Sequence, residues 1–186
     1  DLGAVPDVVV VPAACGDGLA GILRGFEDLM ALGEASSVPR LVAAEPLGPY
    51  SNALVRNLET SDRLKFRRSV AFSTATPVGT YQGLEAIRRS GGTAVAIPED
   101  ELILAAQALV ARVESVFLEA SAAVGVPAVR QLAEHGKIDG EAETVVLIGT
   151  SSGLKDVDTL AKRLSPVRVI EPDLTSLDRA LGGDRP

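Results

Sequence analysis

Short apolar runs alternate with amphipathic stretches along almost the whole chain. The first run, Val8 to Val11, contains only β-branched residues, which is typical of a strand that is buried on both faces. Apolar residues then recur every three or four positions from Leu19 to Met30, so a helix is predicted there. Gly33 is a suitable residue to end that helix. Strand-like and helix-like stretches continue to alternate in this way through the sequence.

The whole pattern predicts an α/β domain. The expected strands are residues 8–11, 41–44, 93–97, 116–118, 144–148 and 167–170. The expected helices are residues 19–30, 48–57, 80–90, 98–113, 120–135, 157–164 and 174–181. Pro127 should kink the helix over 120–135 or displace its start. Because strands and helices alternate with short connections, we expect three layers, with a mostly parallel sheet flanked by helices.

The composition narrows the choice of partner. Hydrophobic residues make up 46% of the 186 residues and aromatic residues 3%, so the core must consist of Val, Leu, Ile and Ala. A net charge of -7 without a long basic run argues against nucleic acid or an anionic membrane as partner. No apolar run approaches the roughly 20 residues that cross a membrane. A single cysteine excludes an internal disulfide and suits a reducing, cytoplasmic location.

Two polar, glycine-containing turns directly follow predicted strands. The first turn spans Ala14 to Gly18, and the second spans Thr150 to Gly153. Ligands of parallel α/β sheets bind at the carboxyl ends of the strands, so both turns are expected at that edge, where they would face one ligand. The first N–H groups of a helix lack partners within the helix and carry the positive end of its dipole. The first turn, which opens a helix, is therefore suited to a phosphate.

The residues themselves leave three interpretations of the first turn open. Gly16, Gly18 and Gly21 match the dinucleotide fingerprint G-x-G-x-x-G. Glu45 ends the next strand, where a ribose-binding acid is expected, so the first interpretation is an NAD-dependent oxidoreductase. The strand breaks at Pro12, however, and the longer turn favours a single terminal phosphate, which is the second interpretation. The third is a tight strand–helix turn without a ligand.

Four separate segments carry a family resemblance. They are residues 6–22 (PDVVVVPAACGDGLAGI), 85–97 (EAIRRSGGTAVAI), 116–123 (VFLEASAA) and 144–156 (TVVLIGTSSGLKD). They resemble segments of the threonine synthase branch of fold-type II pyridoxal-phosphate (PLP) enzymes. The first segment is similar to the strand, phosphate loop and helix of that branch. The other three are similar, in this order, to its segments LRxSGGxAVAV, GxFVEPASAA and TVVLVLTGHGLKD. That branch belongs to the tryptophan synthase β-like superfamily. The resemblance implies PLP as cofactor and the larger, PLP-binding domain of that fold.

The resemblance also implies roles for individual residues. Backbone N–H groups of the first turn would bind the cofactor phosphate, and the residues of that turn are Ala14, Cys15, Gly16, Asp17 and Gly18. Thr150 would form a hydrogen bond with the pyridine nitrogen, and a neutral hydroxyl there suits β-elimination and replacement. Glu119 and the carbonyl of Ala123 are similar to a cation site of some relatives, although an acid at a helix start is the simpler interpretation.

The reaction that the resemblance implies converts O-phosphohomoserine to threonine and phosphate. Asp17 and the Ser151-Ser152 pair depart from the family pattern, and the carboxylate of Asp17 would repel a phosphate unless it points away. A dehydratase, an ammonia-lyase or a β-replacement enzyme acting on another amino acid therefore stays open. A non-catalytic relative that keeps the fold is a further alternative, beside the NAD-dependent oxidoreductase.

None of the lysines of this chain matches the catalytic Schiff-base lysine of that family, which lies in an upstream S-x-K-x-R type motif. The lysines are Lys65, Lys137, Lys155 and Lys162. We therefore expect residues 1–186 to form the PLP-binding domain of a two-domain enzyme without the amino-terminal portion that carries the lysine. This chain alone should be inactive. The expected partners are that portion, a small amino-acid substrate and, because family members are often dimers, a second copy.

Overall fold

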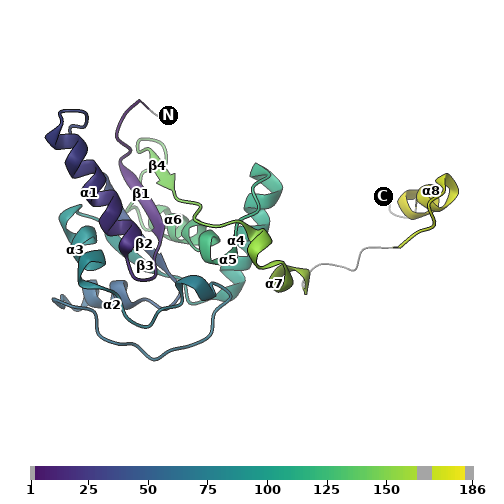
Figure 1. Ribbon diagram of the computed structural model, residues 1–186, viewed down its shortest axis with the longest axis horizontal. Helices are drawn as coiled ribbons and strands as arrows, with labels where there is room; N and C mark the ends of the chain where they lie inside the picture. The colour runs from purple at the N-terminus through teal and green to yellow at the C-terminus, as the bar shows by residue number, and fades with distance from the viewer. Residues whose placement is uncertain (1–2, 163–168, 183–186) are drawn as a thin grey trace. The chain divides into compact units, whose positions relative to one another are not determined.

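The computed structural model describes residues 3–162 and 169–182 of the 186-residue chain. The chain divides into two units, Asp1–Asp156 and Val157–Pro186. The first unit holds the sheet and the helices that cover it (Figure 1).

Four strands of the first unit form one parallel sheet in the order β3-β2-β1-β4. Their bounds are β1 Val8–Pro12, β2 Arg40–Glu45, β3 Thr93–Ala96 and β4 Val145–Leu147. The central strand β1 pairs with β2 on one side and with β4 on the other, so Val10 lies opposite both Val42 and Leu147. The predicted parallel sheet is confirmed.

Helices cover both faces of this sheet (Figure 1). Val8 and Val10 pack into one core with α4, α5 and α6, whereas Val9 and Val11 pack into a second core with α1, α2 and α3. The bounds are α1 Asp17–Ala31, α2 Pro49–Val55, α3 Tyr81–Arg89, α4 Asp100–Glu114, α5 Ala120–Ala123 and α6 Gly125–Glu134. Because each face of β1 is a core face, the strand has no polar position. The three-layer α/β arrangement is confirmed.

Local start and stop signals set several helix ends. Gly33 lies just beyond α1, where its φ of 76° suits the left-handed conformation that follows a helix. Thr80 begins α3, since its side chain accepts a hydrogen bond from the N–H of Gly83 at 3.2 Å. Pro127 lies in the first turn of α6, where its missing N–H is not needed. The helix predicted over 120–135 is therefore divided at Val124 into α5 and α6, as the displaced start required.

The strand predicted over 116–118 is wrong. Leu118 forms only an isolated antiparallel bridge with Ser152. The carbonyl of Leu118 accepts a hydrogen bond from the Gln107 side chain at 2.7 Å, and the carbonyl of Phe117 accepts one from the N–H of Gly153 at 2.8 Å. Because these carbonyls bond to a side chain and to a turn, this segment adds no strand to the parallel sheet.

The second unit contains the helices α7 Val157–Ala161 and α8 Leu174–Gly182. The helix predicted over 157–164 is shorter, and its residues 163–164 lie outside the described residues. Of the strand predicted over 167–170, residues 167–168 lie outside the described residues, and residues 169–170 are not in a strand. Within the described ranges, no helix is long and apolar enough to cross a bilayer.

The turn after α3 packs directly against the start of β2. Gly91 has a φ of +65°, and the N–H of Gly92 donates to the carbonyl of Ile87 at 2.8 Å. A Cβ atom on Gly92 would lie 1.8 Å from the carbonyl oxygen of Leu41. That oxygen belongs to the backbone of β2, so a larger residue cannot be accommodated without moving the strand.

Replacing Gly92 with alanine is therefore expected to lower the free energy of unfolding by about 3 kcal/mol. Gly25 is the matched control, because it lies within α1 and an added Cβ meets nothing within 4 Å. Gly25→Ala should raise the free energy of unfolding by up to about 1 kcal/mol, since alanine favours the helix. Urea unfolding of both variants measures this, and a Gly92→Ala variant as stable as the parent would contradict the packing described.

Candidate cofactor site

The two polar turns leave the sheet at the same edge. Because β1 and β4 are parallel neighbours, with Val10 opposite Leu147, the turns that follow them start side by side. The N–H of Ile148 donates to the carbonyl of Val10 at 2.9 Å, which continues the pairing up to the second turn. The expectation that both turns lie at the carboxyl edge is confirmed.

The first turn presents unpaired backbone N–H groups at the start of a long helix. Gly16 is the N-cap residue of α1, and no side chain caps this helix. The first backbone hydrogen bond here joins the N–H of Ala20 to the carbonyl of Gly16 at 3.0 Å. Within the described residues, the N–H groups of Asp17, Gly18 and Leu19 therefore have no acceptor. A phosphate would supply such an acceptor and would also be stabilised by the helix dipole, so the turn fits the phosphate of PLP.

Tyr50 of α2 packs directly behind this turn. Its ring is completely buried, and three glycines lie against it. A Cβ atom on Gly16 would lie 2.4 Å from the Tyr50 hydroxyl, and one on Gly79 or Gly83 would lie 2.5 Å from ring or hydroxyl atoms. Gly16 also has a φ of +82°, which other residues rarely adopt. Glycine is thus required at position 16 both by its backbone conformation and by the space that Tyr50 occupies.

Thr80 connects the turn to α3. Its N–H donates to the Tyr50 hydroxyl at 3.1 Å, and its own hydroxyl donates to the carbonyl of Cys15. The pKa of Tyr50 is raised, mainly because its hydroxyl is buried. The sequence did not predict a role for Tyr50 or Thr80, because their contacts join residues that are far apart along the chain. The small residues at positions 79 and 83 were the only local signal of a tightly packed neighbour.

The third glycine of the G-x-G-x-x-G motif has no packing role here. A Cβ atom on Gly21 would meet nothing within 4 Å, and one on Gly18 would make an ordinary contact of 3.5 Å with Val11. In a dinucleotide fold the third glycine allows the helix to pack closely on the strand. The match of Gly21 to that motif is therefore coincidental, and the geometry does not support the NAD interpretation.

Glu45 is also unavailable to a ribose. Its side chain is 1% exposed, and its carboxylate accepts hydrogen bonds from the N–H of Tyr50 at 3.0 Å and the N–H of Ser51 at 2.7 Å. Glu45 thus satisfies the amino end of α2 instead of binding a ligand. Burial raises its pKa to about 7, although the hydrogen bonds from Ser51 and Tyr50 act in the opposite direction.

The second turn is anchored on α5. Thr150 is exposed, and the carbonyl of Ser151 accepts a hydrogen bond from the N–H of Glu119 at 3.0 Å. The side chain of Glu119 is fully buried and forms an ion pair with Lys155, whose ammonium nitrogen lies 3.2 Å from Oε2. Glu119 therefore already has a cation beside it. Among the described residues, no three His, Cys, Asp or Glu side chains gather into a metal site.

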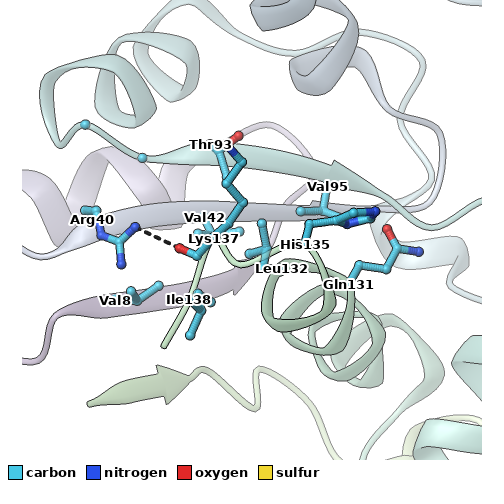
Figure 2. A pocket seen from close by; sticks show the side chains of 12 residues that line it. Val8, Arg40, Val42, Thr93, Val95, Gln131, Leu132, His135, Lys137 and Ile138 are labelled. Carbon is cyan, nitrogen blue, oxygen red and sulfur yellow. Dashed lines mark hydrogen bonds between the residues drawn. The ribbon is translucent and has the colours of Figure 1, made fainter. Parts of the chain in front are cut away.

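A cavity of about 400 Å³ lies at the opposite end of the strands (Figure 2). Val8, Arg40 and Thr93, which begin their strands, line it together with residues of the α6 end. Arg40 donates to the carbonyl of Lys137 at 3.1 Å and forms an ion pair with Glu143. Because its guanidinium is already bonded, and because the first turn is at the other edge, this cavity is not assigned to the cofactor.

Comparison with known proteins decides the family. The sequence model described as "Pyridoxal-phosphate dependent enzyme" matches residues 1–151. The chain belongs to this family. Two curated relatives are the threonine synthases of Methanosarcina acetivorans, 32% identical over 183 residues, and of Methanocaldococcus jannaschii, 30% identical over 181 residues. The alignments cover 96% and 95% of this chain but only 45% and 44% of those relatives. This chain thus spans less than half of their length.

Solved structures show the same fold. The threonine deaminase isoform 2 of Solanum lycopersicum has a TM-score of 0.61 at 24% identity, covering 84% of this chain and 43% of that one. The fungal L-serine ammonia-lyase of Rhizomucor miehei has a TM-score of 0.64 at 17% identity, covering 86% of this chain and 50% of that one. The resemblance to fold-type II PLP enzymes is confirmed, and PLP is the cofactor of the family.

Two substitutions distinguish a phosphate turn from a dinucleotide motif. Gly16→Ala is expected to weaken PLP binding by the intact protein at least about 10-fold, because the new Cβ displaces Tyr50 or the turn. Gly21→Ala should leave the affinity within about 2-fold, since its Cβ points into open space. Titration with PLP, followed by its absorbance, gives both affinities. Equal losses in the two variants would contradict the role given to Gly16.

Glu45 should make stability fall as the pH rises. Because burial raises its pKa from 4.5 to about 7, the folded protein favours the protonated acid, and this contribution is complete below about pH 4.5. It is lost as the pH rises through 7, which amounts to on the order of 3 kcal/mol. Unfolding measured between pH 5 and 8 should show this loss in the parent but not in Glu45→Gln. The exposed control Glu59→Gln should keep the slope of the parent.

Proposed function

We propose that residues 1–186 form the cofactor-binding domain of a PLP-dependent lyase similar to threonine synthase. The reaction adds water to O-phosphohomoserine, by elimination and replacement, and gives threonine and phosphate. The similarity to curated threonine synthases along 96% of the chain carries this proposal. The strand, phosphate turn and helix at the carboxyl edge of the sheet support it.

The first turn would hold the cofactor through its phosphate. The N–H groups of Asp17, Gly18 and Leu19 would donate to it, and the dipole of the 15-residue helix α1 would stabilise its charge. The side chain of Asp17 is exposed, so its carboxylate has room to point into solvent, away from the phosphate. Tyr50 and Thr80 would keep the turn in shape from behind, through the contacts with Gly16 and Cys15.

Thr150 would orient the cofactor ring. It lies in the second turn, beside the first one at the sheet edge, and we assign its hydroxyl to the pyridine nitrogen. PLP supplies the electron-withdrawing ring on which the chemistry of the substrate depends. A neutral hydroxyl does not hold a proton on the ring nitrogen as a carboxylate would, and this favours elimination and replacement.

The Schiff-base lysine is proposed to lie in an amino-terminal portion of the intact protein. Lys155, at the second turn, has its ammonium 3.2 Å from a buried carboxylate, which leaves it unsuited to act as a nucleophile. Lys65 and Lys137 are exposed and lie away from both turns in sequence. The chain covers 45% of the length of a related threonine synthase, which leaves room for such a portion in the intact protein.

A second candidate is a dehydratase or ammonia-lyase that acts on another amino acid. Asp17 and the Ser151-Ser152 pair favour it, because they depart from the threonine synthase pattern at the two turns. The solved threonine deaminase and L-serine ammonia-lyase share the fold with this chain.

A product assay on the intact protein distinguishes these candidates. With O-phosphohomoserine we expect PLP-dependent release of phosphate and threonine in equal amounts. Formation of ammonia and a 2-oxo acid from L-threonine or L-serine, without turnover of O-phosphohomoserine, would favour the second candidate. A lack of all products despite bound PLP would indicate a non-catalytic relative. Residues 1–186 assayed alone should give no product, and turnover by them would contradict the proposed position of the lysine.

A further inference from the structure

Glu119 is a fully buried acid that the proposed reaction does not use. It precedes α5 as the N-cap residue, yet its side chain does not cap that helix. Its carboxylate lies instead between three segments that are distant in sequence. These are the short 3-10 helix η1 Phe72–Thr74, the start of α5, and the second turn with the following 3-10 helix η2 Gly153–Lys155.

Each carboxylate oxygen of Glu119 has a partner from a different segment. Oε1 accepts a hydrogen bond from the Ser73 hydroxyl at 2.7 Å. Oε2 lies 3.2 Å from the ammonium nitrogen of Lys155. The backbone N–H of Glu119 also donates to the carbonyl of Ser151 at 3.0 Å, and the N–H of Ser73 donates to the Ser121 hydroxyl at 3.1 Å. The acid therefore joins η1, α5 and the second turn at one point.

The charge of this acid has to be balanced. Burial acts to raise the pKa of Glu119, but hydrogen bonds from surrounding side chains outweigh it and hold the pKa below its ordinary value. Those side chains are Ser151, Ser73, Lys155 and Ser121. The carboxylate is thus ionised at neutral pH while it is 0% exposed, and an ionised group in that position requires a nearby positive charge.

Lys155 supplies that charge with little loss of its own hydration. Its side chain is 58% exposed, so the ammonium keeps much of its hydration while it approaches the buried oxygen. An ordinary surface ion pair contributes little, because both partners are solvated when apart. Here only the lysine is solvated, and removal of the lysine would leave a buried charge with hydrogen bonds from hydroxyl groups but no opposite charge beside it.

A free cation does not fit at Glu119 together with this lysine. A metal ion bound to Oε2 would lie within a few ångströms of the ammonium and would be repelled by it. Ala123 adds only a backbone carbonyl, and no group of three His, Cys, Asp or Glu side chains gathers at Glu119 in the described residues. The cation site implied by the family resemblance is thus not available while Lys155 is in place.

We propose that the ammonium of Lys155 is a built-in replacement for a free monovalent cation at Glu119, so that the protein needs no such ion to hold the second turn. Lys155 and Glu119 are positioning residues, because they act on Thr150 through the turn. The effect on PLP binding rests on the proposed function, whereas the effect on stability does not.

The test compares Lys155→Met with Lys162→Met in the intact protein. Both variants lose one positive charge, and Lys162 is an exposed residue after α7. The midpoint of thermal unfolding and the PLP affinity are measured in potassium, ammonium and choline chlorides at equal ionic strength. Choline is a much larger cation than potassium or ammonium, so we expect only the two small ions to approach Glu119 in place of the lysine.

The parent and Lys162→Met should have the same midpoint in all three salts. Lys155→Met should lose about 10 °C in choline chloride and bind PLP about 10-fold more weakly. Potassium or ammonium should restore at least half of both losses, with a saturable dependence on concentration. The double variant Lys155→Met/Glu119→Gln should be more stable than Lys155→Met in choline chloride and insensitive to the salt, because no buried charge remains.

Three results would overturn the proposal. They are a saturable rise of the parent's midpoint with potassium, a Lys155→Met midpoint equal to that of Lys162→Met, and a loss in Lys155→Met that no small cation restores. If Lys155→Met does not fold, the double variant decides: a folded, salt-insensitive protein supports the proposal, and an unfolded one overturns it. A parent protein that binds no PLP would instead refute the proposed function. The unfolding midpoints would still test whether Lys155 replaces a cation at Glu119.

Discussion

The parallel pairing of β1 with a strand on each side is the constraint on which the candidate site depends. Because β1 and β4 are parallel neighbours, the turns after them leave the sheet at the same edge, and the helices on each side of the sheet bury both faces of β1. Two segments more than a hundred residues apart thereby start next to each other. One segment offers unpaired N–H groups at the start of α1, and the other offers the hydroxyl of Thr150.

The pKa values of two buried carboxylates near this edge are shifted in opposite directions. Glu45 accepts only backbone and hydroxyl hydrogen bonds at the start of α2, so burial dominates and its pKa rises to about 7. Glu119 has hydroxyl groups and the ammonium of Lys155 around it, and its pKa falls. Burial is thus the stronger influence at Glu45, whereas at Glu119 the hydrogen bonds from Ser151, Ser73, Lys155 and Ser121 outweigh it.

Sequence signals were reliable where a residue determines the conformation of the backbone at its own position. The β-branched run predicted β1, Gly33 and Thr80 predicted helix ends, and Pro127 predicted the interruption between α5 and α6. The prediction of a strand over 116–118 was wrong, because hydrogen bonds from Gln107 and Gly153 decide the state of that segment. A short apolar run has no property of its own that distinguishes a strand from a buried connection.

The sequence by itself determined the alternation of elements, the three layers, the position of the glycine-containing turn before α1 and, through four resembling segments, the PLP enzyme family. Each was predicted from patterns within short stretches of the chain and from the order of those stretches. Only the tertiary structure decided which glycines of the turn matter, because the requirement at Gly16 comes from the ring of Tyr50 and Gly21 faces open space. It also placed Glu45 under α2 and Lys155 beside Glu119. Both placements depend on burial and on distances between remote residues, which the order of residues along the chain does not contain.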